Sequence, residues 1–360
     1  MPVELRFGTE LSGAHNTVAE SPRIAAIAEK SGFDYVWVPD HIRSAVARGL
    51  ASGGDMYPEL WTNLTSIGLS TKKIVVAPGV TDCLRRHPAT VAQIVASLDR
   101  LLQGRVILGV GAGEAMNLDP YGIVWDNPVQ RLQEAISVIR MLWRSSMDEP
   151  ANFEGRYHRL NGAFMEIRPI RENIPIYIGS LGKRMREITG ELGDGWYPWI
   201  NTPSTYARAL EDVCRGAERV GRTIDEIDTT TPVLTAISTD RDEARKAVET
   251  RAKVYLLAER HVLESLGYQP PVGKDFTVQR MILDKEQSQR MLEVSSAIPS
   301  EYVEQIAAFG SPDDCIEKME EFIEAGARHL VIENVSTDPE GSYGILGSKI
   351  IPYLRSQYRE

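Results

Sequence analysis

The sequence has few of the residues that build disulfide scaffolds or metal sites. Its 360 residues include three cysteines, Cys83, Cys214 and Cys315, and six histidines. The cysteines are far apart and form no Cys-x-x-Cys pair, which argues against a disulfide framework or a structural zinc site. The histidines show no His-x-x-x-His spacing. We therefore expect no metal site.

The sequence also lacks a basic excess and long apolar runs. The formal net charge is −10 and the Lys and Arg residues are scattered, which argues against a nucleic-acid-binding surface. No apolar stretch approaches the length that crosses a bilayer, and the start, Met-Pro-Val-Glu-Leu-Arg, does not resemble a signal peptide. We expect a cytoplasmic protein that binds a small molecule, not nucleic acid or a membrane.

Short β-branched runs alternate with helical patterns along the whole chain. This alternation predicts an α/β fold, a single (β/α)₈ TIM-barrel domain over residues 1–360, with a doubly wound sheet carrying an appended helical piece as the alternative. The predicted strands are Val3–Thr9, Tyr35–Pro39, Ile74–Val80, Val106–Val110, Ile174–Ser180, Gly195–Ile200, Asp228–Ser238 and His329–Val335. Helices are predicted at 21–32, 88–102, 129–143, 310–325 and 347–356.

Two segments are too long to be simple connections. They span about residues 41–60 and 254–300, and the second contains Pro270-Pro271-Val272-Gly273 between helical patterns. Long loops that follow barrel strands often cover the ligand site. We therefore predict that both segments are insertions in βα loops above the site.

The stretch 106–117, Val-Ile-Leu-Gly-Val-Gly-Ala-Gly-Glu-Ala-Met-Asn, joins a buried strand to a glycine-rich end. Gly109, Gly111 and Gly113 would let backbone N–H groups approach a flat or anionic ligand without a side-chain clash. The spacing does not match the dinucleotide-binding pattern, which needs a further glycine at the start of the helix. The glycines alone are equally compatible with a tight bend between strand and loop.

Polar residues follow several of the predicted strands. In a (β/α)₈ barrel the carboxyl ends of the strands meet on one face, where these enzymes place their chemistry. An imidazole beside carboxylates can be tuned for proton transfer near neutral pH. We therefore predict His41, Glu114 and Glu10 as catalytic residues. The structural alternatives are a loop cap for His41, a helix N-cap for Glu114 and a strand terminus for Glu10.

Other polar and aromatic clusters are open to two interpretations. The run Arg85-Arg86-His87-Pro88 is interpreted as a solvated helix start in preference to a site for an acidic group. Trp196 and Trp199 fit an apolar pocket wall and a packed core equally well. Trp125 and Trp143 are predicted to lie in the core.

Several stretches taken together resemble one family, the deazaflavin (coenzyme F420)-dependent branch of the luciferase-like barrels. They are Val38-Pro39-Asp40-His41, Pro78-Gly79-Val80-Thr81, Arg86-His87-Pro88-Ala89, Gly111–Asn117, Tyr121–Trp125 and Pro128-Val129. The resemblance runs from about residue 5 to 350. Members of this branch include methylenetetrahydromethanopterin reductase, F420-dependent secondary alcohol and glucose-6-phosphate dehydrogenases, and phthiodiolone ketoreductase-like proteins.

The resemblance implies that the chain binds coenzyme F420 and moves a hydride between deazaflavin C5 and a carbonyl, secondary alcohol or methylene-tetrahydropterin carbon. His41 would exchange a proton with the substrate oxygen and Glu114 would steady the developing charge. Gly79-Val80 would be a cis peptide, and residues 179–182 would hold the phosphate through backbone N–H groups. The implied coenzyme contacts are Asp40, Gly79, Val80, Thr81, Gly111, Ala112, Gly113, Glu114, Met116, Asn117, Gly179, Ser180, Leu181 and Gly182.

The chain departs from the family pattern at two places. The tryptophan expected four residues after the histidine is Ala45 here, and Trp61 is one candidate replacement. No lysine occurs in Tyr197–Asn201, which disfavours a phosphorylated sugar and favours an apolar or pterin-like substrate. The alternatives are an FMN-dependent luciferase-like monooxygenase and a non-catalytic flavin-binding barrel. The resemblance also implies a homodimer or homotetramer.

Overall fold

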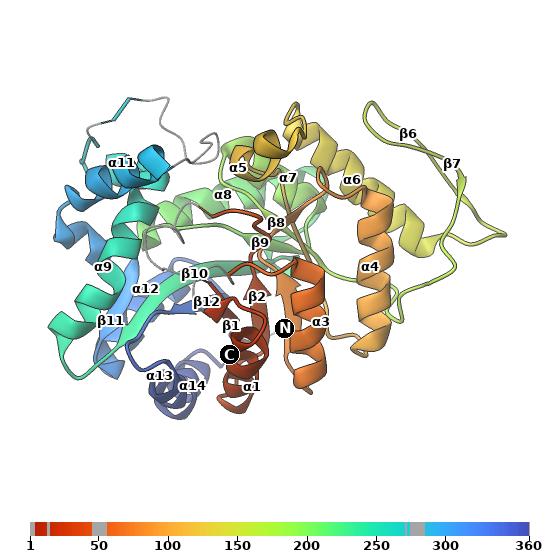
Figure 1. Cartoon of the computed structure of the whole chain (residues 1–360). Coiled ribbons are helices and arrows are strands. Elements are labelled where there is room, and N and C mark those ends of the chain that lie inside the picture. The colour runs from red at the N-terminus through yellow and green to blue at the C-terminus, as the bar shows by residue number, and fades with distance from the viewer. Residues whose placement is uncertain (1–3, 13–14, 45–55, 271, 274–284, 360) are drawn as a thin grey trace.

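Parallel strands form the centre of the computed structural model, which describes residues 4–12, 15–44, 56–270, 272–273 and 285–359. In Figure 1 the helices lie around these strands. The strands of the main sheet are β1 (Arg6–Glu10), β2 (Tyr35–Val38), β3 (Val75–Pro78), β4 (Thr81–Asp82), β5 (Leu108–Gly111), β8 (Ile176–Gly179), β9 (Gly195–Tyr197), β10 (Asp228–Ile237), β11 (Ala307–Gly310) and β12 (His329–Asn334).

The sheet closes into the predicted barrel. Pairing runs β3-β2-β1-β12-β10-β9-β8-β5, and β4 pairs with β5 just beyond a break in β3. A parallel bridge between Val76 and Val106 joins β3 to the chain entering β5, which completes the ring. All strand pairs of this sheet are parallel, so the carboxyl ends of the strands meet on one face of the barrel.

Helices connect successive strands, and several begin with a proline that suits the first helical turn. Ser311 and Thr202 start two of them with capping boxes, in which the side chain and the backbone exchange hydrogen bonds. The helices are α1 (Glu20–Lys30), α3 (Leu60–Ser70), α4 (Pro88–Leu101), α5 (Ala115–Leu118), α6 (Pro128–Arg144), α7 (Lys183–Leu192), α8 (Pro203–Arg219), α9 (Arg241–Ala258), α10 (Arg260–Ser265), α11 (Lys285–Ser296), α12 (Pro312–Glu324), α13 (Pro339–Ile345) and α14 (Ile351–Gln357).

Two local features differ from the sequence-based expectation. Strand β11 pairs with the second half of β10, whereas the prediction began a helix at Gly310 and had no strand there. The antiparallel hairpin β6 (Ala151–Glu154) and β7 (Arg159–Ala163) was also not predicted, because its short, largely exposed strands carry little apolar pattern. Figure 1 shows this hairpin extending away from the barrel. The carboxylate of Glu134 anchors its turn by accepting three backbone N–H groups.

Parts of both predicted insertions lie outside the described residues, namely 45–55, 271 and 274–284. The described part of the second segment includes the end of α9 together with α10 and α11, and α11 packs on α9 (Figure 1). No helix in the described ranges is long and apolar enough to cross a membrane.

The amino-terminal end of the barrel interior holds a buried polar cluster. Asp228 Oδ2 accepts a hydrogen bond from Tyr177 Oη at 2.5 Å and lies 2.9 Å from His329 Nδ1. Arg6 adds an ion pair to the same oxygen at 3.0 Å. Trp37 packs beside this group, with its ring centroid 5.5 Å from that of Tyr177. The core at this end is therefore both aromatic and ionic.

Candidate active site

A cavity of about 330 Å³ opens at the carboxyl ends of the strands. The structure brings together there every residue that the sequence nominated as catalytic or coenzyme-binding. They are Glu10, Asp40, His41, Gly79, Val80, Thr81, Gly111, Ala112, Gly113, Glu114, Met116, Asn117, Gly179, Ser180, Leu181 and Gly182.

His41 lies at the mouth of β2 and is oriented by Asn117. The Asn117 Oδ1 atom accepts hydrogen bonds from the backbone N–H groups of Ile42 and Arg43 at 2.9 and 3.1 Å. The other amide atom is therefore Nδ2, a donor, and it lies 3.0 Å from His41 Nδ1. Because Nδ1 accepts this bond, a neutral His41 carries its proton on Nε2.

Glu114 lies beside this pair and does not act as a helix cap. It occupies the N-cap position of α5, but its side chain accepts no backbone hydrogen bond there. Instead, Oε2 is 3.3 Å from Asn117 Nδ2 and 3.6 Å from His41 Nδ1. The carboxylate is thus placed to stabilise a protonated imidazole.

Asp40 is buried and neutralised by two arginines. Its Oδ2 atom accepts from Thr81 Oγ1 at 2.5 Å and from Arg86 at 2.7 Å, and it pairs with Arg85 at 2.9 Å. Arg85 also bonds Asp82 at 2.6 Å. The Arg85 and Arg86 side chains are only 7% and 20% exposed, so their interpretation as solvated residues was wrong. They hold the acidic strand ends together.

His87 and Pro88 do start a helix, as predicted. The His87 ring accepts a hydrogen bond from the backbone N–H of Ala89, and Pro88 is the first residue of α4. The sequence-based interpretation of the two arginines was wrong because their partner carboxylates, Asp40 and Asp82, lie at the ends of β2 and β4. They do not lie at neighbouring helix positions, where a local pattern would show them.

The peptide between Gly79 and Val80 is cis, which confirms the prediction. The Val80 side chain lies inside the barrel wall against the glycines of the neighbouring strands. A Cβ on Gly111 or Gly179 would come within 2.7 or 2.8 Å of Val80, and one on Gly109 would lie 2.0 Å from the carbonyl oxygen of Pro78. These glycines therefore make room for the bulge at Val80, a reason that the sequence did not reveal.

The segment Gly179–Gly182 forms the opposite wall and leads into α7. Gly182 is the N-cap of α7, no side chain caps this end, and its first turn contains no acidic residue. A Cβ on Gly182 would meet no atom within 4 Å, so the backbone faces open space. Lys183 and Arg184 begin the helix. Arg184 is paired with Glu187 and Glu191, so the N–H groups of the first turn and Lys183 are the groups that suit an anion.

A second group of charged residues lies at and directly behind the floor of the cavity. Glu10, at the end of β1, accepts a hydrogen bond from Tyr197 Oη at 2.9 Å. Glu333, near the end of β12, is bonded by Arg251 and by Tyr255 Oη, the latter at 3.0 Å. Burial, reinforced by the negative charge of Glu333, raises the pKa of Glu10 to about 8.

Aromatic residues complete the cavity. Trp199 lies against Tyr255, with ring centroids 5.2 Å apart, and both line it. Trp125 also lines it and donates from Nε1 to the carbonyl oxygen of Ala112 at 2.9 Å, so its placement in the core was wrong. Trp196 is in the core, stacked on Tyr206.

Two further tryptophans are packed away from the cavity. Trp143 is buried in the main core, as predicted. Trp61 is buried in the same core and does not line the cavity, so it does not replace the missing indole. Tyr57 is a better candidate for the aromatic wall beside the histidine, since its ring centroid is 5.4 Å from that of His41 and it lines the cavity.

Sequence reasoning missed several of the residues that line the cavity or bond to its floor. Arg251 and Tyr255 come from α9 at helical spacing, and only the packing of α9 over the barrel reveals them. Glu333 could have been found, because it is an acidic residue near the end of a predicted strand, as Glu10 is. Ser12, which donates to Glu333 and to which Arg251 donates, follows β1.

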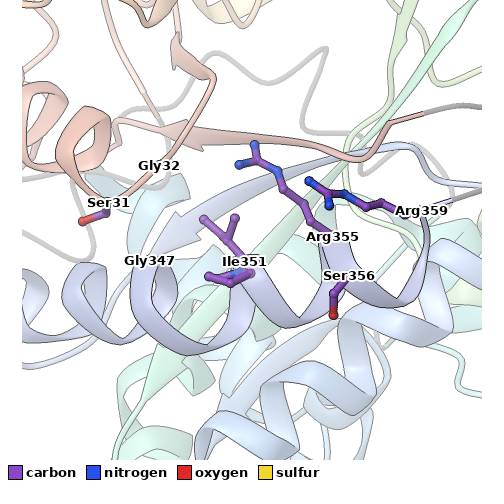
Figure 2. Close-up of a pocket in the computed structure, with 8 residues that line it drawn as sticks. Ser31, Gly32, Gly347, Ile351, Arg355, Ser356 and Arg359 are labelled. Carbon is purple, nitrogen blue, oxygen red and sulfur yellow. The ribbon is translucent and has the colours of Figure 1, made fainter.

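Another cavity, of about 310 Å³, lies between α1 and α14 (Figure 2). Arg355 of α14 and Arg359, just after it, extend to the same side there, and Ser31 lies at the end of α1. Arg355 is already paired with Asp34 at 2.6 Å. This cavity is near the amino-terminal ends of the strands and contains none of the residues predicted to be functional.

Two curated relatives match nearly the whole chain. The 5,10-methylenetetrahydromethanopterin reductase of Archaeoglobus fulgidus is 29% identical over 331 residues, covering 91% of this chain and 94% of the relative. The phthiodiolone/phenolphthiodiolone dimycocerosates ketoreductase of Mycobacterium tuberculosis is 33% identical over 360 residues, with 92% of each chain covered. Because both matches are nearly full-length, no large part of either relative is missing from the aligned region.

A solved structure of an F420-dependent oxidoreductase is also similar to this chain. An F420-dependent secondary alcohol dehydrogenase, in complex with an F420-acetone adduct, superposes with a TM-score of 0.81 at 25% identity and covers 97% of this chain and 98% of that chain. The family model described as luciferase-like monooxygenase matches residues 4–329. The chain therefore belongs to the luciferase-like monooxygenase family and has its TIM-barrel fold.

Proposed function

We propose that this protein is a coenzyme F420-dependent oxidoreductase. The observation that carries the proposal is that all residues nominated from the F420-dependent branch line one cavity at the carboxyl ends of the strands. The relatives support an oxidoreductase, since they are named as a reductase, a ketoreductase and a dehydrogenase. The substrate carbon would belong to a carbonyl or secondary alcohol, or to a methylene-tetrahydropterin.

The donor groups of the cavity fit a deazaflavin with an anionic tail. The free N–H groups at the start of α7, with Lys183 beside them, would hold the phosphate. Val80 and the Gly111–Asn117 segment would support the ring. Asp40 lines the cavity but is saturated by Thr81 and two arginines, so we assign it to organising that wall.

Bound F420 would supply a ring carbon, C5, that accepts or gives a hydride. The chain's own task is to handle the accompanying proton. His41 would give this proton to, or take it from, the substrate oxygen at Nε2, because Asn117 occupies Nδ1. When His41 is doubly protonated, Nδ1 can no longer accept from Asn117. Its N–H can then donate to Glu114, whose Oε2 is 3.6 Å away.

Glu10 would provide a second acid on the cavity floor. Its pKa of about 8 keeps the carboxyl protonated at neutral pH, with Oε2 accepting from Tyr197. A methylene-tetrahydropterin presents a nitrogen in place of an oxygen, and this carboxyl group would donate a proton to that nitrogen. Trp199, Tyr57 and Tyr255 would pack against the flat or apolar part of the substrate.

The test is a titration of the purified protein with oxidised F420, followed by addition of secondary alcohols, with methylenetetrahydropterins assayed against reduced F420. We expect binding at micromolar concentrations and loss of the visible absorbance with a suitable alcohol. No binding would overturn the proposal. Oxygen consumption with reduced FMN would instead favour the monooxygenase that the family description names. Binding without turnover on any substrate would favour a non-catalytic barrel.

We also propose that the protein acts as a homodimer or homotetramer in the cytoplasm. This rests on the resemblance to F420-dependent enzymes, because the structure describes a single chain. Light scattering of the purified protein would give the mass directly. A mass near 40.1 kDa would identify a monomer and contradict the proposal.

A further inference from the structure

Glu10 lines the floor of the cavity, and a second carboxyl group, Glu333, lies just outside the lining, where it is bonded to the cation Arg251. Glu10 and Glu333 come from the neighbouring strands β1 and β12, which pair in register up to Thr9 and Ile332. Arg251 reaches them from α9, and its side chain is 15% exposed. Two ionised carboxylates at close range with one cation are unfavourable in a partly desolvated site, so one of them keeps a proton.

The hydrogen bonds show which carboxyl group is ionised. Glu333 is surrounded by donors: Arg251, the Ser12 hydroxyl, and the Tyr255 hydroxyl, which lies 3.0 Å from each of its two oxygens. This is the environment of a carboxylate. In contrast, the side-chain donor to Glu10 among the described residues is the Tyr197 hydroxyl.

Within the described part of the chain, the charges that act on Glu10 are those of Glu333 and Arg251. The register neighbour of Glu10 on β2 is Trp37, which is uncharged. Two more titratable groups interact with the Arg251–Glu333 pair, His15 after β1 and Tyr57 before α3. Burial lowers the pKa of His15 and raises the pKa of Tyr57, so both are held neutral at pH 7.

We infer that Glu333 is a positioning residue that, by holding Arg251 as its own counter-ion, leaves Glu10 as a neutral carboxylic acid on the cavity floor. With Oε2 accepting from Tyr197, the proton of Glu10 is available to a group in the cavity. This inference goes beyond the proposed function, since it concerns the protein without coenzyme and holds for any substrate class.

The test follows the carbonyl stretch of protonated Glu10 by infrared difference spectroscopy during a pH titration of the full-length protein without coenzyme. Glu10→Gln removes the band and so identifies it. In the parent protein we expect the band to disappear with a midpoint near pH 8. In Glu333→Gln the midpoint should fall by at least about one pH unit, because a like charge is gone and Arg251 is released.

Variants of Arg251 test the same inference by removing the cation in place of the neighbouring carboxylate. Arg251→Met should raise the midpoint, because both carboxyl groups then lack a cation, while Arg251→Lys should restore it towards the parent value. Glu264→Gln, which removes an exposed partner of Arg260, is the matched control and should leave the midpoint unchanged.

Opposite shifts in Glu333→Gln and Arg251→Met would not result from a general loosening of the fold. An unchanged midpoint in Glu333→Gln, or shifts of the same sign in the two variants, would overturn the inference. If Glu333→Gln does not fold, Arg251→Met compared with Arg251→Lys decides it. Because no coenzyme is present, the outcome is independent of whether F420 binds.

Discussion

The two ends of the barrel each contain a buried group of acids, arginine and tyrosines, but in different proportions. At the amino-terminal end one carboxylate, Asp228, is bonded by Arg6, His329 and Tyr177. At the carboxyl-terminal end, apart from the Asp40–Asp82 cluster with its two arginines, Glu10 and Glu333 lie close to one arginine, Arg251, which pairs with Glu333. The first group has a surplus of donors, and the second has a shortage of positive charge.

This difference changes the protonation of the acids in opposite directions. Burial alone would raise the pKa of Asp228, but its contacts with His329 and Arg6 outweigh burial and hold that pKa well below its usual range. At the other end, burial and the charge of Glu333 act together to raise the pKa of Glu10. Removing one partner from a saturated ion cluster leaves a buried charge unpaired and destabilises the fold, whereas an unsaturated cluster provides a group that can exchange a proton.

Removing the charge at the amino-terminal end should give the largest effect. Asp228→Asn leaves Arg6 and His329 without their anion, so we expect the free energy of unfolding to fall by about 4 kcal/mol. Urea unfolding at neutral pH measures this loss. Glu154→Gln, at an exposed ion pair with Arg159, is the control and should cost less than about 0.5 kcal/mol. Equal losses in the two variants would mean that the cluster is not a stability element.

The next effect belongs to the opposite end and concerns rate, not stability. His41→Ala removes the proposed proton carrier, so turnover of a suitable alcohol with F420 should fall about 100-fold, equivalent to about 2.7 kcal/mol. F420 affinity and urea stability should stay close to those of the parent. Steady-state kinetics with a coenzyme titration separate these quantities. A rate within threefold of the parent would remove His41 from the mechanism.

A smaller loss of rate is expected for the residue behind His41. Glu114→Gln keeps the shape of the side chain but removes the charge 3.6 Å from His41 Nδ1, so the rate should fall about tenfold. The rate should depend on pH differently from that of the parent, because the imidazolium has lost its anion. A Glu114→Asp variant, which keeps the charge, should recover part of the rate. If both variants match the parent, the charge has no part in the reaction.

The sequence predicted the residues at the strand ends better than those that come from helices. Glu10, His41 and Glu114 could be placed together because the carboxyl ends of parallel strands meet whatever the packing of the helices. Arg251 and Tyr255 could not, since their position depends on how α9 crosses the barrel mouth. That packing is a tertiary property, with no counterpart in the local pattern.

The glycines at the end of the fourth predicted strand also have a role that depends on tertiary packing. From the sequence, Gly109 and Gly111 fit a close approach of a ligand and a tight bend equally well, and Gly111 does line the cavity. The structure adds that both glycines also accommodate the neighbouring strand around Val80 and Pro78. A single sequence cannot distinguish these two reasons, because each requires only the absence of a Cβ.

The smallest effect near pH 5 should come from replacing Glu10 with glutamine, and the way this effect changes with pH separates the two ends most clearly. Below about pH 4.5 Glu10 is protonated in both folded and unfolded chains. Between about 4.5 and about 8 only the folded chain binds this proton, so the parent loses stability as the pH rises. Gln cannot ionise and avoids that loss.

Glu10→Gln should therefore be within about 1 kcal/mol of the parent near pH 5 and become relatively more stable towards pH 8. Urea unfolding of both proteins across this range measures the difference. Asp228 should show no such trend, because its lowered pKa keeps it ionised throughout the range, and stability from Asp228 is lost only at acidic pH. A stability difference for Glu10→Gln that stays constant from pH 5 to pH 8 would show that Glu10 is already ionised, and that the two ends of the barrel do not differ in the way proposed.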